Sequence, residues 1–177
     1  LIANHTDLKI DFTGGISTDG DISSAYEHGA DYITASSIAV TNPELFASWI
    51  VSFGREKITL SADITDVKSK QVAFRGWLKK SELNLYDHLQ FFYERGLKYA
   101  KCTDISRDGT MEGPDFNFYQ DILNRFPDLK VLASGGVRNT DDIKRLNEMG
   151  VFAVIFGKSF YEGQLNLKDL EQFLVKS

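Results

Sequence analysis

Two Gly-Gly turns give the first indication of chemistry in this sequence. Gly14-Gly15 and Gly135-Gly136 each close a short β-like run, and each is followed by an acidic helix start and a second apolar run. The second run ends at Ser36 in the first copy and at Gly157-Lys158 in the other. Such turns present backbone N–H groups at a helix N-terminus, where an anion, and above all phosphate, binds favourably. Two copies therefore predict two phosphate sites and a ligand with a phosphate at each end.

Carboxylate and hydroxyl side chains end two other apolar runs. Asp63 ends one run, and apolar surroundings there would favour its protonated form, which suits a general acid. A cap or turn role is the alternative for Asp63, because Asp66 follows closely. Thr103 ends the other run and offers an uncharged donor and acceptor, and Asp108 stands beside Gly109 in the loop that follows. For Asp108 the alternative to a catalytic group is an ordinary turn residue.

Three further side chains suit contact with a flat, anionic ligand. Arg75 can form a forked pair of hydrogen bonds to phosphate or carboxylate, and Trp77 can stack on a flat heterocycle. Packing of Trp77 onto the body of the protein is the alternative. Lys158 follows Gly157 at a predicted helix start and would add positive charge to the second turn, although most lone Lys residues are simply solvated.

The composition bounds the class of protein. The 177 residues are enough for one domain with a core, and 42% hydrophobic and 25% charged residues are usual for a soluble globular protein. A net charge of −5 argues against a nucleic-acid partner, and no apolar run is long enough to predict a membrane span. With Cys102 as the single cysteine and only scattered histidines, we predict no disulfide, no metal site and a reducing, cytoplasmic location.

The elements that must position these residues alternate between strand and helix. This alternation with short connections predicts an α/β fold with parallel strands beneath covering helices. The predicted strands are Leu8–Thr13, Tyr32–Ala35, Lys57–Asp63, Lys98–Thr103, Lys130–Ser134 and Phe152–Phe156. The predicted helices are Asp19–His28, Pro43–Phe53, Leu85–Arg95, Asp115–Phe126, Thr140–Met149 and Leu167–Val175. A further β segment, Gln71–Trp77, predicts one arm of a hairpin over the end of the sheet.

Polar and Gly-rich segments follow the strands, as they do in a (βα)8 TIM barrel, where the active site lies at that end. No Gly-x-Gly-x-x-Gly follows a first strand, which disfavours a dinucleotide-binding sheet. A barrel needs eight β/α units, whereas six are counted here, and the residues after Leu1 resemble the middle of a helix. We therefore expect residues 1–177 to form the C-terminal portion of a single barrel domain, with a complete six-unit sheet as the alternative.

Several motifs together resemble one family. Those that resemble the histidine-biosynthesis isomerases called HisA are Cys102–Thr110, Gly113-Pro114, Ala133–Val137, Gly157-Lys158, Tyr161–Gly163, Arg75–Trp77 and Asn42–Leu45. The resemblance covers essentially the whole chain, beginning at the family's third strand. The segment from Thr103 to Gly109 is shared with the sister cyclases of the HisF type.

The resemblance implies a two-fold symmetric (βα)8 barrel that acts on phosphoribosyl-formimino-aminoimidazole-carboxamide ribonucleotide (ProFAR), a small molecule with a phosphate at each end. The reaction is an Amadori rearrangement of this aminoaldose to the aminoketose PRFAR, without metal or cofactor. Asp63 would open the ribose by protonating its ring oxygen, and loss of a proton from C2′ would then give the enol that becomes the ketose. Thr103 would bind the reacting sugar, with Asp108 beside it.

The resemblance also implies the contacts to the two ends of the substrate. One phosphate would be held by Gly14, Gly15 and Ser36, and the other by Ser134, Gly135, Gly136, Gly157 and Lys158. Trp77 would stack near the aminoimidazole, and Arg75 would help to anchor the substrate.

The sequence departs from the family pattern at the first phosphate site. Thr13 stands where a third Gly is usual, Ala35-Ser36 where Gly often precedes a hydroxyl residue, and Ser17 replaces a frequent basic residue. The family's catalytic base lies on its first strand, before the matched part, so the chain alone is expected to lack isomerase activity. Two unpaired strands at an open barrel edge are expected to associate with the N-terminal part, to swap or to aggregate.

Three other functions compete with the isomerase. One is the HisF-type cyclase, a lyase that works with an amidotransferase, and Arg75–Trp77 favours the isomerase over it. Another is a non-catalytic phosphate-binding fragment of the same fold. The third is a tryptophan-pathway isomerase, which needs one phosphate site and is therefore disfavoured by two Gly-rich turns.

Overall fold

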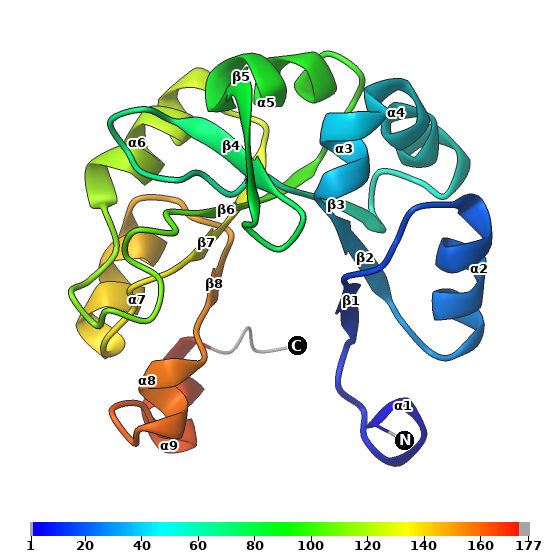
Figure 1. Cartoon of the computed structure of the whole chain (residues 1–177). Coiled ribbons are helices and arrows are strands. Elements are labelled where there is room, and N and C mark those ends of the chain that lie inside the picture. Colours follow the sequence, from blue (N-terminus) through cyan, green and yellow to red (C-terminus); the bar gives the residue numbers. More distant parts are fainter. Residues whose placement is uncertain (1, 174–177) are drawn as a thin grey trace.

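The structure, a computed structural model, describes residues 2–173, and its centre is a curled parallel sheet. The strands lie in the order β1 (Asp11–Thr13), β2 (Tyr32–Ala35), β3 (Ile58–Ser61), β6 (Tyr99–Thr103), β7 (Lys130–Ser134) and β8 (Ala153–Ile155). Every neighbouring pair in this sheet is parallel. Figure 1 shows the sheet as an arc, with β1 and β8 at its two ends and helices along its outer side. The predicted α/β class and the six parallel strands are confirmed over the described residues.

Helices follow the strands and cover the outer face of the sheet. The longer ones are α2 (Asp19–Glu27), α4 (Pro43–Ser52), α5 (Leu85–Tyr93), α6 (Phe116–Arg125) and α7 (Thr140–Glu148). The short ones are α1 (Ile2–His5), α3 (Ser37–Thr41), α8 (Lys158–Tyr161), α9 (Leu167–Leu170) and the 3-10 turn Glu171–Phe173. The helix predicted over Leu167–Val175 is thus shorter, and its last two residues lie outside the described part. None of the helices in residues 2–173 is long and apolar enough to cross a membrane.

Side-chain caps explain where the predicted helices begin. Thr18 accepts a hydrogen bond from the Asp21 amide, and the Asp21 carboxylate accepts one from the Thr18 amide, which forms a capping box for α2. At α4, Asn42 accepts from the Leu45 amide and Pro43 takes the first helical position. Helix α3 begins directly after Ser36, where the repeat predicts a helix start, and no side chain of the described residues caps it.

The alternation of side chains along the strands produces two different faces. On β6, Ala100 and Cys102 are fully buried in the apolar core beneath the helices. Lys101 lies between them in sequence and faces the inside of the arc, where it lines a cavity with Thr34 of β2 and Ser61 of β3. The outer face of the sheet is therefore apolar, whereas the inner face is polar near the carboxyl ends of the strands.

A hairpin crosses one end of the sheet. Its strands, β4 (Gln71–Phe74) and β5 (Lys79–Asn84), are antiparallel, and they follow β3 in the chain. Figure 1 shows it in front of the upper part of the arc. The predicted hairpin arm at Gln71 is confirmed, and Arg75, Gly76 and Trp77 form its tip rather than part of a strand.

The outer core contains one buried histidine. The ring of His88 on α5 lies edge-on to Phe92, with 5.1 Å between the ring centroids, and its Nε2 atom has no hydrogen-bond partner among the described residues. Burial lowers the pKa of His88 from 6.5 to about 4, because the apolar surroundings disfavour the imidazolium.

This buried ring makes the fold sensitive to acid. Above pH 6.5 His88 is neutral in the folded and the unfolded chain, but below that pH the unfolded chain takes up a proton that the folded chain refuses until about pH 4. We expect His88 to remove on the order of 3 kcal/mol of stability between pH 6.5 and pH 4. Urea unfolding of the chain and of His88→Leu at several pH values tests this. The free energy of the variant should fall less steeply with acid, and parallel curves would contradict the expectation.

Candidate active site

The two Gly-rich turns have the same backbone conformation. The φ angles of Gly14-Gly15 are 95° and 73°, and those of Gly135-Gly136 are 93° and 79°. The residues before α3 and α8 also match, with φ and ψ of −122° and −65° at Ser36 and of −136° and −69° at Gly157. The positive φ angles of the two Gly-Gly turns bring no strain to glycine, whereas they would strain a residue with a side chain. The predicted internal repeat is therefore confirmed in the backbone.

Strand pairing around the two turns repeats as well. Asp11 pairs with Tyr32 between β1 and β2, and at the corresponding positions Leu132 pairs with Ala153 between β7 and β8. In the sheet order, β1 is the first strand and β7 is the fifth. The two copies of the unit are therefore displaced by four strands around the arc.

The first turn opens into a cavity of about 590 Å³. Its lining combines residues from the turn, the start of α3, the end of β3 and the hairpin tip. Those that the sequence predicts for the site are Gly14, Gly15, Ser36, Asp63, Arg75 and Trp77. The fold thus places the predicted acid, the predicted aromatic contact and the predicted residues of the first phosphate site around one space.

Asp63 is buried at the edge of this cavity, with 4% of its surface exposed. Its Oδ2 accepts hydrogen bonds from Ser61 Oγ at 3.2 Å and from Trp77 Nε1 at 2.9 Å. Its Oδ1 lies 3.6 Å from Lys101 Nζ. The expectation of apolar surroundings for Asp63 is therefore wrong, because Ser61 and Lys101 beside it on the inner face are polar.

The neighbouring carboxylate has the turn role that was the alternative for Asp63. Asp66 accepts hydrogen bonds from the amides of Lys68 and Ser69, both at 2.9 Å. With the Ser69 hydroxyl, these bonds lower the pKa of Asp66 to about 2. The side chain of Asp63 contacts other side chains instead, whereas Asp66 accepts the hydrogen bonds from the backbone amides.

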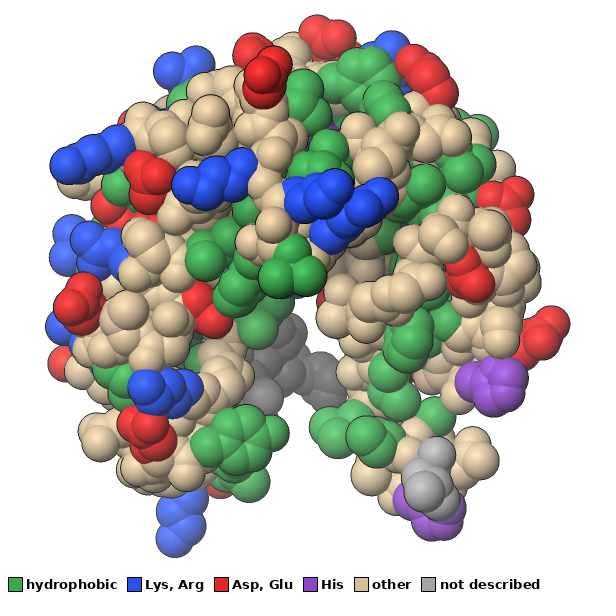
Figure 2. All heavy atoms as spheres, in the orientation of Figure 1, with side chains coloured by type: hydrophobic (Ala, Val, Ile, Leu, Met, Phe, Trp, Pro, Cys, Tyr) green, Lys and Arg blue, Asp and Glu red, His purple; other side chains and the backbone are tan. Residues whose placement is uncertain are grey.

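The hairpin tip reaches back to the start of α3 and to Asp63. The φ angles of Arg75, Gly76 and Trp77 are 55°, 62° and 68°, a left-handed run that costs about 1–3 kcal/mol at each non-glycine residue. The Arg75 amide donates to Ser37 Oγ at 2.9 Å, and the Trp77 indole donates to Asp63. These two bonds fix the tip over the cavity. Figure 2 shows Lys and Arg side chains gathered on this face near the tip.

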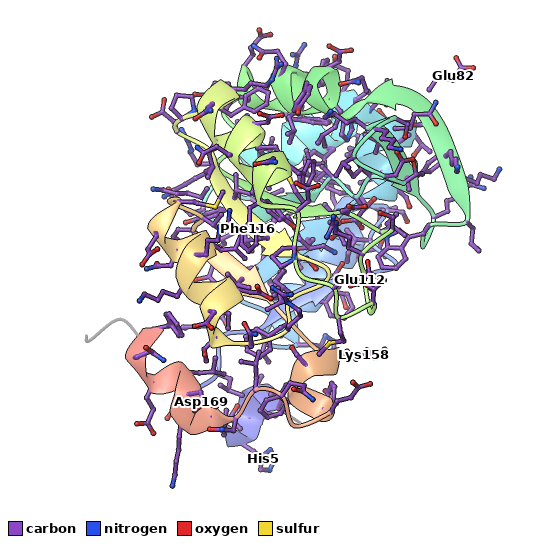
Figure 3. The ribbon with its side chains drawn as sticks, turned by 90° about the vertical axis from the view of Figure 1, so that its left-hand side faces the viewer. His5, Glu82, Glu112, Phe116, Lys158 and Asp169 are labelled. Atoms are coloured by element: carbon purple, nitrogen blue, oxygen red, sulfur yellow. The ribbon has the colours of Figure 1, made fainter. Side chains whose placement is uncertain are left out.

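The second turn opens into a separate cavity of about 250 Å³. Its lining includes the predicted residues Asp108, Ser134, Gly135, Gly136, Gly157 and Lys158. The ammonium of Lys158 donates to the Gly109 carbonyl at 2.6 Å and lies 3.7 Å from Glu162. Figure 3 shows Lys158 at the start of α8, below the loop that holds Glu112. Lys158, the cation predicted for the second phosphate site, therefore lines the second cavity.

The loop after β6 joins the predicted catalytic residues to the second turn. Thr103 is 1% exposed, and its Oγ1 has no hydrogen-bond partner in the described part of the chain. Asp104 accepts hydrogen bonds from the amide and the hydroxyl of Ser106 within the same loop. Arg107 donates to the Gly113 carbonyl at 3.0 Å, and the Gly113 amide donates to the Gly136 carbonyl at 3.0 Å.

This close contact makes Gly136 a sensitive position. A Cβ atom there would lie 2.8 Å from the Gly113 carbonyl oxygen, and φ is 79°. At Gly150 the φ angle is 93°, but a Cβ atom would meet open space. We expect Gly136→Ala to destabilise the fold by about 1–3 kcal/mol more than Gly150→Ala, because only the first change adds a backbone clash. Urea unfolding of both variants measures the difference, and equal losses would show that the contact relaxes at no cost.

Lys101 is the site residue that the sequence prediction missed. In β6 the polar residues Tyr99, Lys101 and Thr103 alternate with the apolar Ala100 and Cys102. This period of two was a usable signal that Lys101 shares a face with Thr103. The signal could not reveal its partner Asp63, which follows β3, because the hairpin and α5 separate β3 from β6 in the chain.

Comparison with known proteins identifies the family. Residues 1–166 match the profile of the histidine biosynthesis proteins. This chain belongs to that histidine biosynthesis family. The resemblance to the HisA branch is confirmed by relatives that carry the name 1-(5-phosphoribosyl)-5-((5-phosphoribosylamino)methylideneamino) imidazole-4-carboxamide isomerase, which is ProFAR isomerase.

Two of these family members show the extent of the match. The isomerase of Bacteroides thetaiotaomicron is 47% identical over 173 residues, which cover 98% of this chain and 71% of the relative. The isomerase of Flavobacterium psychrophilum is 44% identical over 174 residues, which cover 98% of this chain and 71% of that relative. The names of these histidine biosynthesis relatives favour the isomerase over the HisF-type cyclase.

Proposed function

We propose that this chain provides the acid and the two phosphate sites of a ProFAR isomerase. The observation that supports this most directly is the cavity that joins Asp63 to Gly14-Gly15 and Ser36. The name of these relatives contains two phosphoribosyl groups, and the chain contains two matching turns. The substrate would therefore be the aminoaldose ProFAR and the product the aminoketose PRFAR.

The displacement of the repeat supports a (βα)8 barrel. A two-fold rotation that moves β1 onto β7 advances by four strands in the sheet order. Applied twice, the same rotation returns to its start after eight strands, which is the number in a closed barrel of this class. Residues 1–177 would then be the C-terminal portion of one barrel domain, and the two turns would lie on opposite sides of its mouth.

The chemistry begins at Asp63. In its protonated form Asp63 donates to the ring oxygen of the ribose, and the ring opens. The protein then removes the proton on C2′, which gives the enol that becomes the ketose. Thr103 ends β6, which pairs with β3, the strand that precedes Asp63. Its buried hydroxyl lacks a partner among the described residues and would bind the reacting sugar. Asp108 lies in the loop above Thr103 and would contact the same sugar.

The two ends of the substrate would occupy the two turns. Gly14-Gly15 and Ser36 offer amide groups for one phosphate, and Gly135-Gly136 and Gly157 offer them for the other. Lys158 and Ser134 line the second cavity and would complete that site. Trp77 and Arg75 at the hairpin tip would hold the aminoimidazole and anchor the substrate.

Turnover by a completed enzyme tests the proposal. The chain is joined to the two N-terminal β/α units of the Bacteroides thetaiotaomicron isomerase, and this fusion is called the completed enzyme below. We expect it to convert ProFAR to PRFAR and not to consume PRFAR together with ammonia. Consumption of PRFAR with ammonia would instead indicate the cyclase, and tight binding of ProFAR without turnover would indicate a binding protein.

A further inference from the structure

The central strand of the sheet places a cation inside the arc. Lys101 is on β6, which lies between β3 and β7, and it pairs in register with Ser61 of β3. The side chain of Lys101 is 21% exposed and lines the first cavity together with Asp63 and Arg75. Lys101 therefore lies in the space where the proposed acid must work.

The two oxygens of Asp63 have different surroundings. Oδ2 accepts from Ser61 and Trp77, whereas Oδ1 is buried and has no hydrogen-bond partner among residues 2–173. The Lys101 ammonium lies 3.6 Å from Oδ1, too far for a good hydrogen bond but close enough for an ion pair. A buried carboxylate oxygen without a partner is costly, so this ammonium is well placed to offset that cost.

The other charges on this face are few. Asp11 of β1 accepts hydrogen bonds from Thr34 Oγ1 at both of its oxygens, at 2.8 and 2.7 Å. Burial raises the pKa of Asp11, while the Thr34 bond and the Lys101 charge oppose that rise. Arg75 lines the cavity from the hairpin tip. Lys101 is thus within electrostatic reach of Asp11 on β1 and of Asp63, which follows β3.

We propose that Lys101 is a positioning residue for Asp63, which holds Oδ1 toward the cavity and stabilises the carboxylate that remains once Asp63 has given its proton to the ring oxygen. The inference rests on the proposed role of Asp63 as the acid. The proton passes from Asp63 to the substrate, and the ammonium of Lys101 keeps its own protons throughout. A positive charge at position 101 is what this role requires, so Arg can replace Lys101 but Met cannot.

The two tryptophans of the chain allow a direct test. The Trp77 indole donates to Asp63, and the Trp49 indole donates to Asp19, so each indole N–H signal in a nitrogen-correlated NMR spectrum reports on one carboxylate. Trp77→Phe assigns the two signals. We expect Lys101→Met to shift the Trp77 signal and to leave the Trp49 signal in place, and Lys101→Arg to restore the original position.

A matched control and a reciprocal measurement complete the experiment. Lys98 precedes β6 and pairs with Glu56 on the surface, so Lys98→Met removes an equal charge without changing the Trp77 signal. If Lys101→Met does not fold, Asp63→Asn should shift the side-chain signals of Lys101, which are assigned by their loss in Lys101→Arg. An unmoved Trp77 signal in folded Lys101→Met, or unmoved Lys101 signals in Asp63→Asn, would overturn the proposal. Turnover of the completed enzyme is judged separately, so failure here leaves the proposed function standing.

Discussion

Replacing Asp63 by Asn is expected to lower the turnover of the completed enzyme by about 10²- to 10⁴-fold, which is the usual contribution of a general acid. Asn has nearly the same shape and can still accept the hydrogen bonds from Ser61 and Trp77, but it has no acidic proton to give. Affinity for ProFAR should change little, because the phosphate sites are untouched. Steady-state kinetics with ProFAR separate the two quantities.

Asp66→Asn is the matched control for this prediction. Asp66 is three residues away, and its Oδ1 accepts only from backbone amides of its own turn. The Asn side chain can keep those bonds, so turnover should stay within a few-fold of the unsubstituted enzyme. If Asp63→Asn behaved like Asp66→Asn, the assignment of Asp63 as the acid would be wrong.

The chain of residues 1–177 alone should show no measurable isomerase turnover, although it should bind a bisphosphate ligand. The reason is chemical: the proposed acid Asp63 would open the sugar ring, but the resemblance to the HisA family implies a base on a strand that precedes the matched part. Loss of a general base alone removes about 10²- to 10⁴-fold of the rate. Assays of the chain beside the completed enzyme, with calorimetric titration of PRFAR into both, give the comparison.

Either of two outcomes would contradict this second prediction. Turnover by the isolated chain would mean that a residue within it acts as the base, and Asp11, the other carboxyl on the inner face, would be the first to replace. Failure of the chain to bind PRFAR would mean that the two turns need the closed barrel to form.

Much of the fold follows from local signals. Gly14-Gly15 and Gly135-Gly136 have positive φ angles at both residues, so the glycines mark the turns without ambiguity. Asn42 and Pro43 fix the start of α4 for equally local reasons. Strand ends are less certain: the predicted strand Leu8–Thr13 is confirmed only over Asp11–Thr13, because strand ends depend on the pairing partner.

The site depends more on contacts between distant parts of the chain. The sequence places Asp63 at a strand end, but its neighbours come from β3, β6 and the hairpin tip, and no local pattern brings these together. Trp77 was predicted to stack on a heterocycle, a role that stays a prediction, while its bond to Asp63 was not foreseen. Lys101 was visible in the alternation of β6, yet its meaning appears only when the strand order is known.

The repeated unit also bears on how an unsymmetrical molecule is oriented. Two sites related by a two-fold axis accept a compound with like ends in either of two directions, and only one direction can present the correct sugar to Asp63. The copies differ where Ser17 corresponds to Arg138 and where Ser37 corresponds to Lys158. These substitutions break the equivalence, so in the proposed enzyme the head and the tail of the molecule would meet different side chains and one direction would be preferred.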